Sequence, residues 1–371
     1  MEFIDLKAQF RAYQEELEAA ALRVLRSGRY ILGPEVEALE RELSSFVGVK
    51  YAVGVSSGTD ALFLILKALG VGPGEAVLTS PFTFAATAEV IALLGAKVIF
   101  ADIDPETFLL SPATVRKALE EARKQGESPR AVIFVSLFGL AAYLDELEEM
   151  ARKEGFFLIE DACQSLGARF KGRASGAFGL AGATSFFPAK PLGGYGDGGM
   201  VFTSEPELAE KIRALRVHGQ KGRYHHAYLG LNARLDPLQA ALLRVKLKHF
   251  PEEIEKRAKV AERYREGLAG LPVRFQEIPP GASSVYAQFV IRAKERDALR
   301  EFLAQKGIPT AIYYPRPLHL QPAFKDLPYE EGALPVAERL SREVLALPMH
   351  PFLTEKDQDF VIESVREFYG A

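Results

Sequence analysis

The stretch GATSFFPAKPLGGYGDGG, residues 182–199, joins a strand-like apolar run to a lysine and then to a glycine-rich turn. Five of its last seven residues are glycine, so the backbone there can approach a flat ligand closely. Lys190 therefore follows a predicted strand with little side-chain cover. A partly desolvated lysine can attack a carbonyl group. A surface lysine on a flexible loop is the alternative, and loop composition alone favours it.

Other β-rich runs precede and follow this stretch, and most of them are apolar throughout, as in strands covered on both faces. Amphipathic stretches lie between the earlier runs, at 61–69 and 85–95. This βαβ alternation predicts an α/β domain around a mostly parallel, seven-stranded sheet. The runs are YAVGV (51–55), AVLTS (76–80), KVIFAD (97–102), AVIFVS (131–136), FFLIED (156–161), TSFF (184–187) and GMVFTS (199–204).

The pattern changes after residue 204. Two long helices are predicted at 236–250 and 252–270, with Pro251 as a break between them. Strands such as 285–293 and helices such as 295–307 then indicate a smaller α+β unit. A chain of 371 residues is longer than one typical core. We therefore expect a large domain over residues 1–250 and a small C-terminal domain over residues 251–371.

The composition favours a small-molecule ligand. The 49 acidic and 46 basic residues nearly cancel and form no tails or blocks, so neither nucleic acid nor an anionic membrane is expected as a partner. The single cysteine, Cys163, excludes an intramolecular disulfide and a cysteine-based zinc site, and no metal site is predicted. No apolar run approaches the ~18 residues of a membrane span. The N-terminal MEFIDLKAQF does not resemble a signal peptide, so a cytoplasmic location is expected.

Polar residues that follow apolar strands mark the candidate site, because open α/β sheets bind ligands beyond the carboxyl ends of their strands. Asp161 ends the run 156–161. An unpaired carboxylate at the end of a buried strand would be costly unless a cation or strong donor met it. The protonated pyridine nitrogen of pyridoxal phosphate is such a donor, and that cofactor needs an acid there to act as an electron sink. A helix cap or a structural ion pair is the alternative.

A second polar segment, SSGTDAL (56–62), follows the strand 51–55. Gly58 and Thr59 open a helix there, so free backbone amides and the positive helix end point above the sheet. This arrangement suits a phosphate group, although a simple cap is the commoner explanation. The segment lacks the spacing of a P-loop or of a GxGxxG fingerprint, which makes a nicotinamide dehydrogenase improbable.

At these places the sequence resembles the sugar aminotransferases of the DegT/DnrJ/EryC1/StrS family, which have fold type I of the pyridoxal phosphate enzymes. The matching segments run in order along almost the whole chain. They are SGRYILGPEVEALE (27–40), SSGTDAL, PFTFAATAEVIALLGAKVIFADIDPET (81–107), IEDACQSLGARFKGR (159–173), SFFPAKPLGGYGDGG (185–199) and NARLDPLQAA (232–241).

The resemblance assigns roles to these positions. It makes Lys190 the residue that attaches pyridoxal 5'-phosphate covalently and later carries a proton, and Asp161 the partner of the pyridine nitrogen. Gln164 would approach the phenolic oxygen of the cofactor. Phe84 would stack on the cofactor ring, a role that its flat apolar face supports independently, and ordinary core packing is the alternative.

The phosphate contacts implied by the resemblance come from two subunits. Ser185 and the backbone of Gly58 and Thr59 match contacts made within one chain. Asn232 matches a residue that reaches the phosphate from a second subunit. The resemblance therefore implies a homodimer with shared active sites, which moves an amino group from glutamate to a nucleotide-linked keto sugar.

Within the family, four segments look like the enzymes that aminate C3 of UDP-2-acetamido-2-deoxy-3-keto-hexuronate for surface polysaccharides. The segments are MEFIDLK (1–7), RYHH (223–226), SVYAQF (284–289) and LPMHP (347–351). Such a substrate carries a carboxylate and a diphosphate, so cationic side chains should converge on it. Arg234 is one candidate, unless it only braces the turn before Asp236. The other substrate-side candidates are His218, Tyr313 and Tyr314, though such residues can simply be packed.

Two positions depart from that pattern. Tyr313 stands where the hexuronate group has histidine before Tyr314, and Ala189 stands where serine or glycine usually precedes the lysine. Both departures bear on the identity of the substrate more than on the type of reaction. Enzymes acting on dTDP-linked 3-keto or 4-keto deoxyhexoses are the runner-up, and a regulatory homologue without catalysis is a rival from another class. The presence of Lys190, Asp161 and Gln164 speaks against that rival.

Overall fold

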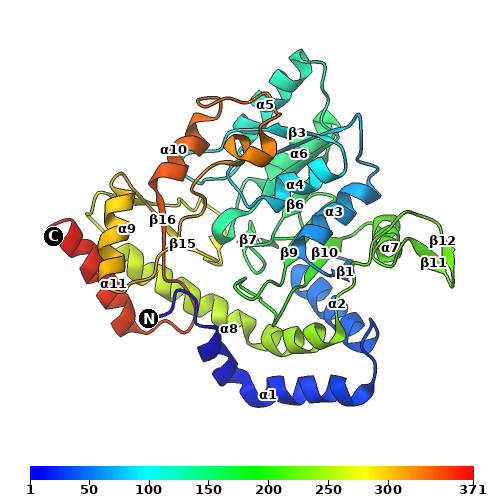
Figure 1. Cartoon of the computed structure of the whole chain (residues 1–371), viewed down its shortest axis with the longest axis horizontal. Coiled ribbons are helices and arrows are strands. Elements are labelled where there is room, and N and C mark those ends of the chain that lie inside the picture. The colour runs from blue at the N-terminus through cyan, green and yellow to red at the C-terminus, as the bar shows by residue number, and fades with distance from the viewer.

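A seven-stranded sheet forms the centre of the protein in the computed structural model, which describes residues 1–371 (Figure 1). Its strand order is β1-β10-β9-β6-β4-β2-β3, and β10 alone runs antiparallel to its neighbours. The predicted α/β fold with a mostly parallel sheet is confirmed. In the order of the sheet, the strands are Tyr51–Val55, Gly199–Thr203, Ala181–Ser185, Phe157–Asp161, Ala131–Val135, Ala76–Thr79 and Lys97–Phe100.

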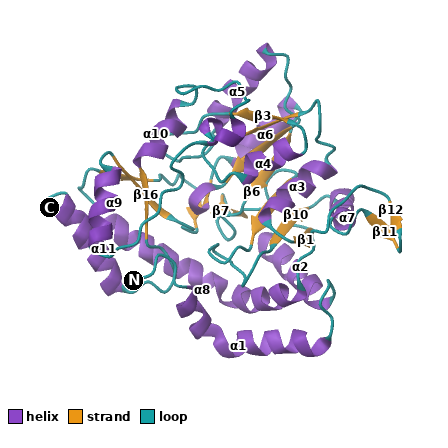
Figure 2. Ribbon diagram, in the orientation of Figure 1, coloured by secondary structure: helices purple, strands orange, loops and turns teal.

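Helices cover both faces of this sheet, which explains why its strands are apolar nearly throughout (Figure 2). In β4, Val132 and Phe134 face one hydrophobic core while Ala131 and Ile133 face the other. The helices of this region are α1 (Leu6–Ser27), α2 (Pro34–Val47), α3 (Gly58–Ala68), α4 (Ala86–Leu93), α5 (Pro112–Lys124), α6 (Leu144–Glu154) and α7 (Pro206–Leu215). None of the chain's helices combines the length and the apolar composition that a membrane crossing requires.

The C-terminal part has its own three-stranded antiparallel sheet and its own hydrophobic core. Its strands are β13 (Val273–Phe275), β15 (Phe289–Ala293) and β16 (Val344–Leu347). Its helices are α9 (Arg296–Gln305), α10 (Pro335–Glu343) and α11 (Glu355–Phe368). The chain also forms three short strand pairs: β5 (Leu140–Ala141) with β14 (Ser283–Ser284), β7 (Arg169–Phe170) with β8 (Arg173–Ala174), and β11 (Gln220–Gly222) with β12 (His225–His226).

The predicted helix break at Pro251 is wrong, because α8 runs continuously from Pro237 to Gly267 with this proline inside it. Proline removes one backbone donor and costs about 3 kcal/mol inside a helix. Packing offsets that cost, since α8 packs against α1 and α2 and also against α11, and Phe250 and Glu253 are buried on either side of the proline. The domain boundary near residue 250 stays a prediction, because this one helix crosses it.

Two strands are displaced from their predicted positions. The strand expected at 184–187 is β9, which ends at Ser185, so Phe187 and Lys190 belong to the loop that follows. The strand expected at 285–293 begins only at Phe289. Tyr286 has a left-handed backbone, with φ of 46°, which a regular strand cannot contain.

Candidate active site

Lys190 lies in the loop between β9 and β10, beyond the carboxyl end of β9. Its backbone N–H donates to the Phe187 carbonyl at 2.8 Å, and the Gly194 N–H donates to the Phe186 carbonyl at 2.7 Å. The lysine is partly buried and forms no ion pair within the chain. Its ammonium group therefore has no carboxylate partner that would occupy it.

The helix α8 holds this glycine-rich loop through two side chains that sequence reasoning missed. Gln239 Oε1 accepts a hydrogen bond from the Tyr195 N–H at 2.8 Å. Lys246 Nζ donates to the Gly193 carbonyl. Burial lowers the pKa of the Lys246 ammonium to about 8, while the charge of Glu253 opposes that shift. The seven-residue spacing of Gln239, Lys246 and Glu253 places them on one helix face, and this spacing of polar residues is the signal that could have found them.

Asp161 ends β6 and is only 5% exposed. Thr87 Oγ1 donates to its Oδ2 at 2.8 Å, and the Cys163 N–H donates to its Oδ1 at 3.2 Å. No lysine, arginine or histidine pairs with this carboxylate, so the structural ion pair considered as an alternative is absent from the chain. A buried carboxylate in this state has lone pairs left for one strong N–H donor, which fits a protonated pyridine nitrogen.

The first turn of α3 lies directly beside the end of β9. Ser57 caps the helix by accepting from the Asp60 N–H at 3.0 Å. The amides of Gly58 and Thr59 belong to the first turn, whose N–H groups have no partner inside a helix. A Cβ at Gly58 would lie 2.8 Å from both Cys163 Sγ and Ser185 Cβ. The turn, Ser185 and Cys163 therefore form one close-packed cradle that suits a phosphate group.

Gly199 makes this cradle possible, so we expect the Gly199→Ala variant to lose cofactor affinity and stability. An added Cβ would lie 2.3 Å from the Ser57 carbonyl oxygen and 2.8 Å from the Gly58 nitrogen. Backbone must move to relieve this overlap, at a cost of about 1–3 kcal/mol. Thermal unfolding and titration of the cofactor-free protein with pyridoxal phosphate measure both effects. Gly72→Ala is the matched control, since its nearest atom would be 3.7 Å away. An unchanged cofactor affinity in Gly199→Ala would contradict the prediction.

Gln164 connects the loop after β6 to Tyr314. Its Oε1 accepts from the Phe138 N–H at 2.7 Å, and its Nε2 donates to Tyr314 Oη at 3.3 Å. Burial raises the pKa of Tyr314, so its hydroxyl stays protonated at neutral pH. Tyr313 instead packs its ring against Phe3, with the ring centroids 6.4 Å apart. The structure thus brings Tyr314 to Gln164 and places Tyr313 against the N-terminal segment.

Phe84 is 58% exposed, so the alternative that it is ordinary core is wrong. Its carbonyl accepts from the N–H of Thr87, the residue whose hydroxyl binds Asp161. The exposed ring therefore belongs to the segment that also contacts the buried carboxylate. A free aromatic face at this position fits stacking on a flat ring.

The remaining candidates lie on the segment between α7 and α8. Arg234 forms an isolated bridge with Val55 at the end of β1, and its guanidinium has no hydrogen bond or ion pair within the chain. The expectation that it only braces a turn therefore has no supporting contact. Asn232 is exposed, and so is His218, which lies just before the β11–β12 hairpin. The hairpin projects from the body of the molecule beside α7 (Figure 1). No hydrogen bond or ion pair joins Asn232 or His218 to Lys190 in the same chain.

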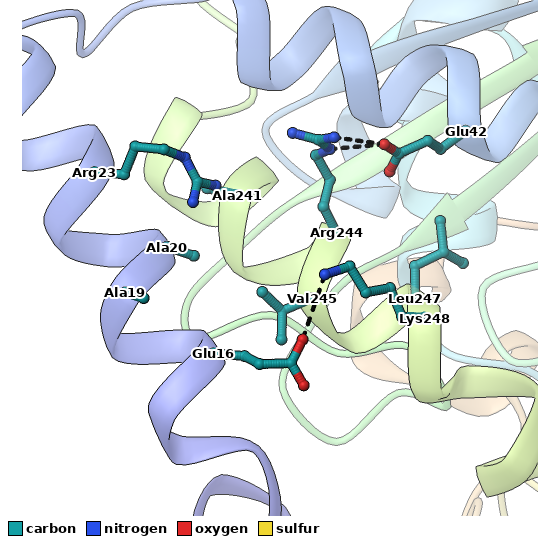
Figure 3. A pocket seen from close by; sticks show the side chains of 10 residues that line it. All are labelled: Glu16, Ala19, Ala20, Arg23, Glu42, Ala241, Arg244, Val245, Leu247 and Lys248. Atoms are coloured by element: carbon teal, nitrogen blue, oxygen red, sulfur yellow. Dashed lines mark hydrogen bonds and ion pairs between the residues drawn. The ribbon is translucent and has the colours of Figure 1, made fainter.

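A cavity of about 450 Å³ between α1, α2 and α8 contains none of these candidate residues. Its charged side chains are already paired: Arg244 donates to Glu42 and Lys248 contacts Glu16 (Figure 3), while Arg23 pairs with Glu35 outside the cavity. This cavity therefore lacks free groups for catalysis. The unpaired groups gather instead at the carboxyl ends of β1, β6 and β9.

Comparison with known proteins connects this geometry to a family. The model of the DegT/DnrJ/EryC1/StrS aminotransferase family matches residues 11–366. The chain is 45% identical to a pleiotropic regulatory protein of Geobacillus stearothermophilus, over 99% of this chain and 98% of that one. It is 47% identical to a UDP-2-acetamido-2-deoxy-3-oxo-D-glucuronate aminotransferase of Pseudomonas aeruginosa, over 95% and 96% of the two chains.

Solved structures agree with this assignment. A DegT/DnrJ/EryC1/StrS aminotransferase from Brucella abortus is 46% identical, covers both chains completely and has a TM-score of 0.97. NtdA from Bacillus subtilis, solved with bound PMP, is 28% identical with a TM-score of 0.89, over 97% of this chain and 82% of that one. The predicted fold type and pyridoxal phosphate dependence are confirmed. The chain belongs to the DegT/DnrJ/EryC1/StrS aminotransferase family.

Proposed function

We propose that this protein moves an amino group from glutamate to a nucleotide-linked keto sugar. The observation that carries the proposal is that Lys190 and Asp161 lie at the same edge of the sheet. The lysine has no carboxylate partner, and the buried carboxylate has no cation. When bound, pyridoxal phosphate supplies an aldehyde on which amines exchange and a ring that accepts the electron pair released at the donor carbon.

The chain's own residues divide the remaining work. Lys190 holds the cofactor covalently, and its freed amine moves a proton at the α carbon of glutamate and later at the sugar carbon. Asp161 keeps the pyridine nitrogen protonated. Phe84 covers the ring, and Gln164 donates near the phenolic oxygen. Ser185 and the amides of Gly58 and Thr59 hold the phosphate.

The sugar that fits best is UDP-2-acetamido-2-deoxy-3-keto-hexuronate, aminated at C3 for surface polysaccharide synthesis. The free guanidinium of Arg234 supports an anionic substrate, and the Pseudomonas aeruginosa relative carries the name of such an enzyme. Tyr314 and His218 are proposed on the substrate side. A dTDP-linked 3-keto or 4-keto deoxyhexose is the second candidate, because Tyr313 replaces the expected histidine and packs on Phe3. A cytoplasmic location stays a prediction.

A substrate panel tests this proposal. The purified protein is incubated with pyridoxal phosphate, glutamate and UDP- or dTDP-linked keto sugars, and any amino sugar is identified by mass and NMR. We expect amination of the UDP hexuronate, with 2-oxoglutarate formed in equal amount. Product only from dTDP sugars would favour the second candidate. No product from any sugar would favour a regulatory role, which the name of the Geobacillus stearothermophilus relative describes.

We further propose that the active unit is a homodimer with shared sites. Asn232 is exposed and its side chain forms no hydrogen bond within its own chain, so it is free to serve a partner. Large apolar side chains also remain exposed on the single chain, and contact with a partner would bury apolar surface of this kind. They include Tyr30, Ile31, Leu93, Phe187, Tyr224 and Leu229.

Subunit complementation tests the shared site. Lys190→Ala and Asn232→Asp chains carry different tags, are co-expressed, and are purified as the mixed dimer. Asn232→Asp places a carboxylate against the phosphate, so each homodimer should be nearly inactive. In the mixed dimer one of the two sites has both native residues, so about half of the wild-type activity should return. If Asn232 serves its own chain, both sites of the mixed dimer are defective and activity stays absent.

A further inference from the structure

Thr87, near the start of α4 (Ala86–Leu93), makes the closest hydrogen bond to Asp161. Its Oγ1 lies 2.8 Å from Asp161 Oδ2, and its side chain is buried with 1% of its surface exposed. The second donor, the Cys163 N–H, is farther from Oδ1 at 3.2 Å. Two groups from different segments therefore hold the two carboxylate oxygens, and Thr87 contributes the shorter bond.

A second hydroxyl extends this hydrogen bond into a chain. Thr83 Oγ1 lies 3.3 Å from Thr87 Oγ1, and Thr83 is also buried. A hydroxyl has one proton, and an ionised carboxylate can only accept, so the Thr87 proton points to Asp161. Thr83 must then donate to Thr87. The two threonines form a directed chain that ends on the carboxylate.

Phe84 lies between these two threonines in the sequence, and its ring is exposed. The position of the ring and the position of the carboxylate are thus set by one short stretch, residues 83–87. A hydrogen bond to a charged group favours the charged form and fixes its orientation. Nothing else in the chain supplies a side-chain hydroxyl to Asp161.

We propose that Thr87 is a positioning residue, which holds the Asp161 carboxylate in place and aimed at the pyridine nitrogen of the cofactor. This inference rests on the proposed function. In this proposal Thr87 acts only through Asp161, to which its hydroxyl donates. Thr83 supports it by donating to its oxygen.

The test compares Thr87→Val, which keeps the shape and removes the hydroxyl, with Thr87→Ser, which keeps the hydroxyl. The dissociation constant for pyridoxal phosphate is measured on the cofactor-free proteins, and kcat and KM for glutamate on the loaded ones. Thr87→Val should weaken cofactor binding and lower kcat by about tenfold each, with KM little changed. Thr87→Ser should stay within about twofold of wild type.

Equal cofactor affinity in wild type and Thr87→Val would overturn the inference, as would a loss in Thr87→Ser as large as in Thr87→Val. If Thr87→Val does not fold, Thr83→Val removes the outer hydroxyl, and a smaller loss of cofactor affinity is expected. An unchanged affinity in Thr83→Val would then overturn the inference. Failure of the wild-type protein to bind pyridoxal phosphate would instead contradict the proposed function, so the two failures are distinguishable.

Discussion

The Lys190→Ala variant is expected to lose amino transfer by at least about a thousandfold, because one side chain serves both as covalent anchor and as proton carrier. Its stability should change little. The Lys190 side chain forms no ion pair, and the loop around it is held by backbone hydrogen bonds and by α8. Product formation from glutamate and the keto sugar measures the first effect, and thermal unfolding the second.

Lys190→Arg is the matched control. Arginine keeps the positive charge but cannot serve as a nucleophile or take up a proton at neutral pH. If the lysine acted only through its charge, Lys190→Arg would keep most of the activity. We expect it to be as inactive as Lys190→Ala. Transfer in Lys190→Ala that falls by less than tenfold would contradict the assigned role.

The sequence predicts the site best where a strand ends in a polar residue. Asp161, Lys190 and the Gly58 turn all end or follow apolar runs, and the sheet brings the ends of those runs together because β1, β6 and β9 share one direction. Periodicity and strand direction are local properties, so they can be read from the chain. An open sheet of parallel strands then places these polar strand ends along the same edge.

The contacts that hold the site were harder to predict, because they join segments distant in sequence. Lys246 lies 53 positions from its acceptor Gly193, and Thr87 lies 74 positions from Asp161. The sequence pattern of a helix does not distinguish a buried lysine such as Lys246 from a surface lysine, because its burial depends on the segment that packs against it. The helix break predicted at Pro251 is wrong for the same reason, because tertiary packing on α1, α2 and α11 outweighs the local cost of the proline.

Two exposed residues, Asn232 and His218, cannot be assigned from one chain alone. The side chains of Asn232 and His218 are exposed and form no hydrogen bond or ion pair within their own chain, so geometry within one chain gives them no role. Family resemblance supplied the prediction for Asn232. Its test is the mixed dimer, because in the proposed arrangement a second copy completes the site.

Asp161→Asn should lower kcat by about a hundredfold or more and weaken cofactor binding, because the amide keeps the size of the carboxylate but removes its charge. Without that charge the pyridine nitrogen loses its proton, and the ring is a weaker acceptor for the electron pair released at the donor carbon. The single amide oxygen can accept from Thr87 Oγ1 or from the Cys163 N–H but not from both, because these donors bind different oxygens of the carboxylate. Steady-state kinetics and titration with pyridoxal phosphate measure the two losses.

Glu160→Gln is the control for Asp161→Asn, because it removes a neighbouring carboxylate of β6 that lies outside the site. Glu160 precedes Asp161 and is completely buried, and its oxygens accept from Ser136, Ser175 and the Gly176 N–H. Burial raises its pKa, and those three donors oppose the shift. An amide there must turn its NH₂ group toward a donor, so stability should fall by about 1–3 kcal/mol. Transfer by the folded protein should stay within about threefold of wild type, since none of these contacts reaches the site. Equal kinetic losses in both variants would mean that Asp161 acts through the fold of β6 and has no direct role at the cofactor.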